Sequence, residues 1–334
     1  VRSDGAVLLA PRADLVRELD TARCWALAAD GEGCWLGTAN PGCVYRWRAG
    51  GEIELVAETD SFMVLSLLPD GEGGVLAGTG PDGRVLQIGA DGSTSRTWEL
   101  QARYVWALER DGDGAVMAGT GPDGRVFRLG EAPELMAQIS QPHVLDLLFD
   151  GERLLAAGGD NEGGVFEITG GGWARDIFGS EEKACTGLAV DEQGRLIIST
   201  AESGKAWVLD PDGDCQEVLE SEGDLLDVAF AGGRAWVATA HDGELVTIDD
   251  RGECAVAARD KLAAEVTCIA AGEDVVFAAS GPPARLWRLD LGAVTEGVYS
   301  SPALDAERRS RWASAWWDAE VPEGAQLQVE ARSG

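Results

Sequence analysis

Imidazole is the side chain best suited to general acid–base catalysis near neutral pH, and the sequence contains it twice, at His143 and His241. Acidic residues lie near both in the sequence, so the pair could serve a lyase or a hydrolase. The two histidines stand two copies apart in the repeat described below, which predicts that their side chains lie beyond hydrogen-bond reach. A histidine at a strand end and another in a turn are also ordinary in a non-catalytic protein, and we favour that interpretation.

Two aspartates, Asp146 and Asp227, occupy equivalent places in the same repeat, and Glu109 lies two residues beyond a third such place at Ala107. Carboxylates near the axis of a ring can hold a hydrated Ca²⁺ or Mg²⁺. They can equally line a water-filled channel without an ion, and we favour this alternative because the three are not neighbours in the sequence. We therefore expect no cofactor, with Ca²⁺ or Mg²⁺ at Asp146 and Asp227 as the alternative.

A third set of acidic residues falls in the turns of the repeat. If these turns gather on one face of a ring, they form a ring of negative charge that attracts a cation or a basic peptide. The alternative is that Asp is simply a favourable turn residue, and we favour it. The acidic turn residues are Asp82, Asp123, Asp160, Glu162, Glu202 and Asp242. Together with His143 and His241, the four aspartates among them are our candidate ligand-binding residues.

Smaller signals have structural explanations. Arg84 and Arg125 could bind a ligand carboxylate, or they could pair with the Asp two residues earlier in each turn. Trp25 and Trp106 share one position of the repeat, which we interpret as packing. The sequence has no phosphate-binding glycine loop before a helix, no nucleophile elbow and no His pair at metal-binding spacing.

The elements that carry these residues are hairpins. Residues 75–88 and 116–129 both read as a strand, the turn Thr-Gly-Pro-Asp-Gly and a second strand. Pro and Asp suit the first two corners of the turn, and Gly accepts the positive φ that follows. Equivalents of Val85 recur at steps of 39 or 41 residues, at Val44, Val126, Val165, Ala206, Leu245 and Leu286. Seven such copies predict an all-β fold, a seven-bladed β-propeller with four antiparallel strands per blade.

The two ends of the repeat region predict how the ring closes. The last blade offers only three strands locally, and the segment 14–19 aligns with the fourth strand of a blade. We expect this N-terminal strand to complete the last blade and close the ring. The apolar segment 5–10 has no assigned place. The repeat fails near Ala293, so we expect the propeller to span 1–297 and a different β domain to start within 298–334.

Composition bounds the partners. The formal net charge of −31 disfavours nucleic acid as a partner, since both carry negative charge. No apolar run approaches the ~20 residues of a membrane helix, so no membrane insertion is expected. Seven scattered cysteines without a CxxC pair indicate small buried side chains, not a disulfide framework, and favour a reducing compartment.

The sequence resembles bacterial seven-bladed propellers of the WD-repeat, YVTN and two-component-regulator type. The matching words are Tyr-Val-Trp-Ala-Leu at 104–108, Ala-Gly-Thr-Gly at 77–80 and Asp-Gly-Arg-Val at 82–85. The tail 298–334 is similar to the truncated start of a galactose-binding-like β-sandwich. In similar proteins that sandwich follows the propeller and many of the chains are exported, so the resemblance implies export against the cysteine argument, and we favour export.

These patterns favour a non-catalytic recognition or scaffold module that offers one ring face to a protein, peptide or glycan. A propeller enzyme, lyase or hydrolase, using the face with His143 and His241 is the main alternative. A structural repeat within an assembly is the third.

Overall fold

A computed structural model describes residues 9–31, 33–292, 319, 321 and 326–330, and all assigned strands lie within the compact unit Val1–Gly297. The described residues form 28 β-strands and no helix, so no helix among them could cross a membrane. Antiparallel pairing groups the strands in fours. The predicted strand 5–10 falls largely outside the described residues, and so does most of the predicted second domain in 298–334, which the unit Val298–Gly334 spans.

Each sheet runs from an inner strand to an outer strand. The inner strands are β2 (Cys24–Asp30), β6 (Met63–Pro69), β10 (Tyr104–Arg110), β14 (His143–Phe149), β18 (Ala184–Val190), β22 (Leu225–Ala231) and β26 (Glu265–Ala271). The second strands are β3 (Gly33–Thr38), β7 (Val75–Gly80), β11 (Val116–Gly121), β15 (Leu154–Gly159), β19 (Leu196–Ala201), β23 (Arg234–Thr239) and β27 (Val275–Gly281).

The third strands are β4 (Cys43–Trp47), β8 (Arg84–Ile88), β12 (Arg125–Leu129), β16 (Gly164–Gly170), β20 (Lys205–Leu209), β24 (Glu244–Ile248) and β28 (Arg285–Asp290). The outer strands are β5 (Ile53–Glu58), β9 (Thr94–Glu99), β13 (Pro133–Gln138), β17 (Trp173–Gly179), β21 (Cys215–Glu220), β25 (Cys254–Arg259) and β1 (Arg12–Glu18). A single residue pair, Gly159 with Ala184, links the sheets β14–β17 and β18–β21 into one hydrogen-bonded path.

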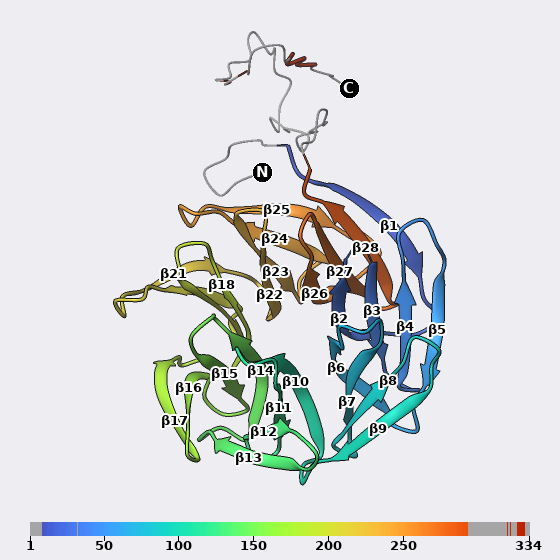
Figure 1. Cartoon of the computed structure of the whole chain (residues 1–334). Helices are drawn as coiled ribbons and strands as arrows, with labels where there is room; N and C mark the ends of the chain where they lie inside the picture. Colours follow the sequence, from blue (N-terminus) through green and yellow to red (C-terminus); the bar gives the residue numbers. More distant parts are fainter. Residues whose placement is uncertain (1–8, 32, 293–318, 320, 322–325, 331–334) are drawn as a thin grey trace. The chain divides into compact units, whose positions relative to one another are not determined.

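The sheets are arranged radially around an axis, as Figure 1 shows. Each inner strand contacts the inner strand of the next sheet, and β26 contacts β2, so the series is circular. Hydrophobic clusters fill the spaces between successive sheets. Leu67, Leu147 and Leu188 are examples of the inner-strand side chains buried there. This is the architecture of a β-propeller.

The N-terminal strand closes the circle. β1 pairs antiparallel with β28, from Arg12 with Asp290 to Glu18 with Arg285, which confirms the predicted pairing of the first strand with the last sheet. The buried guanidinium of Arg285 reinforces this contact. Its Nε donates to Glu18 Oε2 at 2.9 Å, and its Nη1 donates to Asp260 Oδ1 at 2.9 Å. A single buried side chain therefore ties the first strand to the loop before the last inner strand.

Every inner strand carries a β-bulge at the same place. The register with the second strand shifts near the start of each inner strand, for example between Cys24 and Ala26 and between Val105 and Ala107. A bulge leaves one residue unpaired and redirects its side chain. The residues skipped in this way are Trp25, Leu65, Trp106, Leu145, Thr186, Leu226 and Thr267.

Candidate recognition face

One face of the ring collects the starts of the inner strands and the turns between second and third strands; we call it the entrance face. Backbone hydrogen bonds join these two sets of segments. Gly124 N donates to the carbonyl of Pro142, and Asp160 N donates to the carbonyl of Lys183, each just before the next inner strand. The predicted turn conformation is confirmed at Gly83 and Gly124, where φ is +59° and +57°.

Four aromatic side chains stand along part of this face, at the starts of β2, β6 and β10; two are exposed, and Tyr104 and Trp106 are half-buried. Trp25 is 38% exposed and Phe62 is 53% exposed. The guanidinium of Arg103 lies 5.5 Å from the ring centroid of Tyr104, and the ring of Tyr104 lies 5.1 Å from that of Trp106. We call Trp25, Phe62, Tyr104 and Trp106 the aromatic arc. The interpretation of Trp25 and Trp106 as packing residues agrees with Trp106, which packs on Tyr104 and His143, whereas Trp25 is 38% exposed.

The arc ends at His143, whose protonation state is set by a neighbour. Trp106 Nε1 can only donate, and it lies 2.9 Å from His143 Nδ1, so this nitrogen is the acceptor and Nε2 carries the proton. Burial lowers the pKa of His143, and the nearby charge of Asp160 opposes this shift. The imidazole is therefore neutral near pH 7 and offers one N–H donor.

His241 lies in a different environment. Its Nε2 is 3.7 Å from Glu222 Oε2 and 3.9 Å from Asp242 Oδ2. Within the described part of the chain, His143 and His241 share no acid, no hydrogen bond and no ring contact. Within the described residues the two imidazoles thus have different partners, Trp106 for His143 and carboxylates for His241, and do not act on each other.

The acidic turn residues are held by local partners to different degrees. Asp82 accepts hydrogen bonds from Ser61 Oγ and Thr79 Oγ1, both at 2.8 Å, and from Arg84 Nε at 2.6 Å. Burial acts to raise its pKa, but these hydrogen bonds outweigh it and the pKa is lowered. The side chain of Asp82 is thus committed to its own turn.

The other three turn aspartates are less enclosed. Asp123 forms an ion pair with Arg125 at 3.3 Å, and Asp242 pairs with Arg259. The pairing of turn arginines with the aspartate two residues earlier, which the sequence left as one alternative, occurs at both Arg84 and Arg125. Asp160 has a φ of +130°, a conformation rare for a residue with a side chain. The acidic set is therefore spread around the entrance face and does not converge on one point.

Asp146 and Asp227 lie on the inner strands and connect neighbouring sheets. Asp146 accepts from the backbone N–H of Leu147 on its own strand and of Leu188 on the next inner strand, both at 2.8 Å. Asp227 repeats this pattern with Val228 and Ile269, again at 2.8 Å. Each carboxylate thus bridges two inner strands, a role that the sequence analysis did not foresee.

The same burial perturbs the titration of these carboxyls. Burial raises the pKa of Asp227 to about 7, against the two backbone hydrogen bonds that lower it. Burial and then the charge of Asp227 raise the pKa of Asp146 well above its usual range. Burial also raises the pKa of Glu109, and the charge of Glu109 is a further, smaller cause of the raised pKa of Asp146. No group of three metal-ligating side chains occurs among the described residues, so the assignment of Ca²⁺ or Mg²⁺ to Asp146 and Asp227 stays a prediction.

Comparison with known proteins identifies the fold and goes no further. No family model matches the chain, and no curated protein matches it. Among solved structures, a catalytically inactive variant of virginiamycin B lyase from Staphylococcus aureus with quinupristin superimposes with a TM-score of 0.70 at 13% identity, covering 84% of this chain and 99% of that one. The WD40 β-propeller domain of Doa1 superimposes with a TM-score of 0.66 at 14% identity, covering 84% and 97%. The chain therefore has a β-propeller fold.

Proposed function

We propose that residues 1–297 form a seven-bladed propeller that recognises a protein, peptide or glycan on its entrance face and does not catalyse a reaction. The grouping of the strands in fours and the circular contacts of the inner strands support the blade count. The similarity in fold to the WD40 β-propeller domain of Doa1 supports the propeller part of this proposal. Residues 298–334 then begin a second β domain.

The observation that carries this function is the aromatic arc. Large exposed apolar side chains that cluster on one face of a soluble protein mark interaction sites, and aromatic residues dominate the energetic centres of interfaces. Leu262, which is 74% exposed in the loop before β26, adds another apolar side chain to the same face. A partner with an apolar or sugar-ring surface would cover these groups, while basic groups on it would meet the acidic turns.

Peptide and glycan arrays probed with the labelled protein test this proposal. We expect a reproducible set of ligands whose signal falls at least about tenfold in the double variant Trp25→Ser and Phe62→Ser. Trp173→Ser is the matched control, because Trp173 is exposed at the start of β17, away from the entrance face. Recognition by the arc would be refuted if the control and the double variant lost the same array signal. It would also be refuted if the signal were unchanged in both variants.

The alternative function is a lyase or hydrolase centred on His143. Its support is the single fixed N–H donor of His143, together with the similarity in fold to virginiamycin B lyase. Incubation with quinupristin, followed by mass spectrometry of the products, tests it. Product formation by the wild type that disappears in His143→Gln and persists in His241→Gln would favour catalysis over recognition.

A further inference from the structure

A hollow lies at the outer part of the ring, between the sheets β14–β17 and β18–β21. It has a volume of about 270 Å³ and is lined by strands and turns of both sheets. It lies away from the entrance face, because its turns are those between first and second strands and between third and fourth strands. Its lining residues are Arg153, Arg175, Ile177, Leu196, Leu209 and Pro211, with Asp176, Gly194, Asp210 and Gly213 at its margin. We call it the rim hollow.

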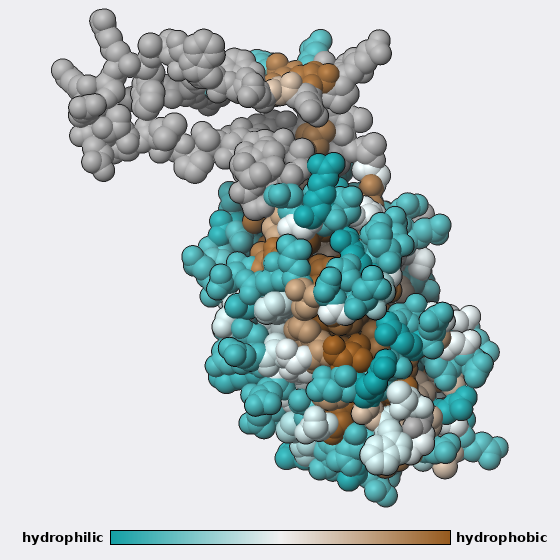
Figure 2. Space-filling model, turned by 90° about the vertical axis from the view of Figure 1, so that its left-hand side faces the viewer, coloured by the Kyte–Doolittle hydropathy of each residue, from teal (hydrophilic) through white to brown (hydrophobic). Residues whose placement is uncertain are grey.

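One wall of the rim hollow is apolar. Ile177, Leu196 and Leu209 belong to one hydrophobic cluster, in which Leu196 is buried and the other two remain partly exposed. Figure 2 views the molecule from the side that carries β17 and β21, and it shows hydrophobic residues exposed in the middle of a mostly hydrophilic surface. Of the three side chains, Ile177 and Leu209 remain partly accessible, whereas Leu196 is only 5% exposed.

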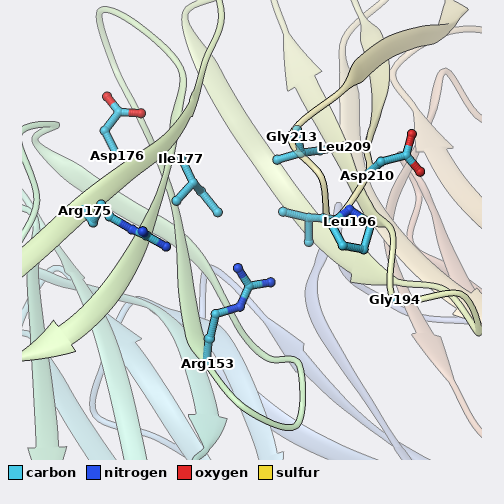
Figure 3. Close-up of a pocket in the computed structure, with 10 residues that line it drawn as sticks. Arg153, Arg175, Asp176, Ile177, Gly194, Leu196, Leu209, Asp210 and Gly213 are labelled. Atoms are coloured by element: carbon cyan, nitrogen blue, oxygen red, sulfur yellow. The ribbon is translucent and has the colours of Figure 1, made fainter.

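The sheet β14–β17 contributes two guanidinium groups beside Ile177, opposite Leu196 and Leu209 of the sheet β18–β21. Figure 3 shows the side chains of Arg153 and Arg175 directed into the hollow, whereas the carboxylates of Asp176 and Asp210 point away from it. Asp176 follows Arg175 along β17, so its side chain stands on the opposite face of the strand. The polar groups that face the apolar wall are thus donors.

Two carboxylates hold the guanidiniums in place and leave donors unused. Arg153 donates from Nε and Nη2 to Asp150 Oδ2 at 3.0 and 2.7 Å, and Arg175 donates from Nη2 to Glu167 Oε2 at 2.5 Å. An arginine has five N–H donors. Arg153 Nη1 lies 3.8 Å from Glu167 Oε2 in an ion pair, and among the described residues neither this nitrogen nor Arg175 Nε and Nη1 forms a hydrogen bond. The site therefore presents oriented N–H groups beside an apolar surface.

A further N–H group without a hydrogen bond lies in the same hydrophobic cluster, at Trp207. Trp207 packs with Leu209 and Ile177 in the space between the two sheets, and its ring lies 5.9 Å from that of Phe178. Its indole Nε1 is buried and has no acceptor among the described residues. Buried polar groups normally find a partner, but Trp207 is not among the residues that line the hollow, so its unpaired N–H lies behind the apolar lining and not in the site itself.

We propose that the rim hollow binds a small carboxylate that carries an aliphatic group. The carboxylate accepts from Arg153 and Arg175, and the aliphatic group covers Leu196 and Leu209. At ~30 Å³ per water-sized group, the hollow holds roughly nine non-hydrogen atoms, which is the size of hexanoate. The same chemistry could come from a free aliphatic acid or from the C-terminal leucine of a peptide. This site is independent of the entrance face.

Isothermal titration calorimetry with hexanoate tests the site at about 0.15 M salt, where the net negative charge of the protein is screened beyond ~8 Å. We expect binding on the order of 1 mM, as suits so small a ligand. Hexanol, which lacks the charge, should bind at least about fivefold more weakly. A tripeptide ending in leucine, compared with its C-terminal amide, distinguishes a peptide source from a free acid.

Two variants locate the binding. Arg175→Gln should weaken hexanoate by about fivefold to tenfold, since charge-assisted hydrogen bonds are the stronger ones, and the side chain is 64% exposed, so the fold should survive. Arg251→Gln, an exposed turn arginine before β25, should bind like the wild type. The proposal is overturned if hexanoate gives no heat at tens of millimolar, if hexanol binds equally well, or if Arg175→Gln binds hexanoate unchanged.

Discussion

Replacing Asp227 by Asn should remove a measurable part of the pH dependence of stability. Burial raises the pKa of Asp227 to about 7 in the folded chain, while an unfolded chain keeps the ordinary value of 3.8. A carboxyl whose folded pKa is raised stabilises the fold when it is protonated, so its contribution is fully present below pH 3.8. This contribution is lost as the pH rises towards 7, because ionisation then favours the unfolded chain.

The magnitude follows from the size of the shift. A shift of about three pH units corresponds to roughly 4 kcal/mol, at about 1.36 kcal/mol per unit. We reduce this to about 2–4 kcal/mol, because Asp227 keeps part of its surface accessible and both its oxygens accept backbone hydrogen bonds. Asp227→Asn cannot ionise, and its carbonyl oxygen retains one of the two hydrogen bonds. The charge of Asp227 also raises the pKa of Asp146, so the variant should relieve that shift as well.

Urea unfolding at intervals from pH 4 to pH 8 measures the effect. We expect the free energy of unfolding of the wild type, relative to the variant, to fall by about 2–4 kcal/mol across this range. Asp212→Asn, an exposed turn residue, is the control for the general loss of one negative charge from a chain of net charge −31. Parallel pH profiles for the wild type and Asp227→Asn would refute the reasoning.

Two further changes test the closure of the ring and its turns. Arg285→Leu leaves Asp260 buried without its guanidinium and should lower the free energy of unfolding by about 3–5 kcal/mol in urea titrations; a loss below about 1 kcal/mol would contradict the role given to this ion pair. Gly83→Ala places a Cβ against the carbonyl oxygen of Ala102 at positive φ and should cost at least about 2 kcal/mol. Gly71→Ala is also at positive φ, but the new Cβ has open space around it, so thermal unfolding should show a smaller loss of stability than for Gly83→Ala. Equal losses of stability would show that the close approach to Ala102 is unimportant.

The sequence predicts the hairpins and the closing strand because their causes are local or periodic. The turn around Gly83 is determined by residue types that are adjacent in the chain, and the repeat brings each copy to an equivalent place. The segment 14–19 could be assigned as a fourth strand by its spacing alone, and β1 pairs as that spacing predicts. These features depend on short-range chemistry repeated many times.

The residues of the candidate sites could be predicted from the sequence only in part. Trp25 and Leu65 occupy equivalent bulges, yet Trp25 is 38% exposed and Leu65 is 6% exposed, so exposure depends on the neighbouring chain segments and not on the repeat alone. A signal was present, because Trp25 and Trp106 share one position of the repeat. Arg153 and Arg175 meet at Glu167 on β16, which pairs with both guanidinium groups within one sheet, and the sequence alone does not show this register. The calcium or magnesium prediction and the acidic face remain predictions that need ligands to test them.

Hydrogen–deuterium exchange on the chain, with and without the best array ligand, tests recognition by the entrance face most directly. We predict that binding slows exchange in the loops that lead into the inner strands, at residues 20–23, 60–62 and 101–103, which flank the aromatic arc. Slowed exchange confined to the opposite turns, such as 70–74 and 111–115, with no change in the loops beside the arc, would contradict the account.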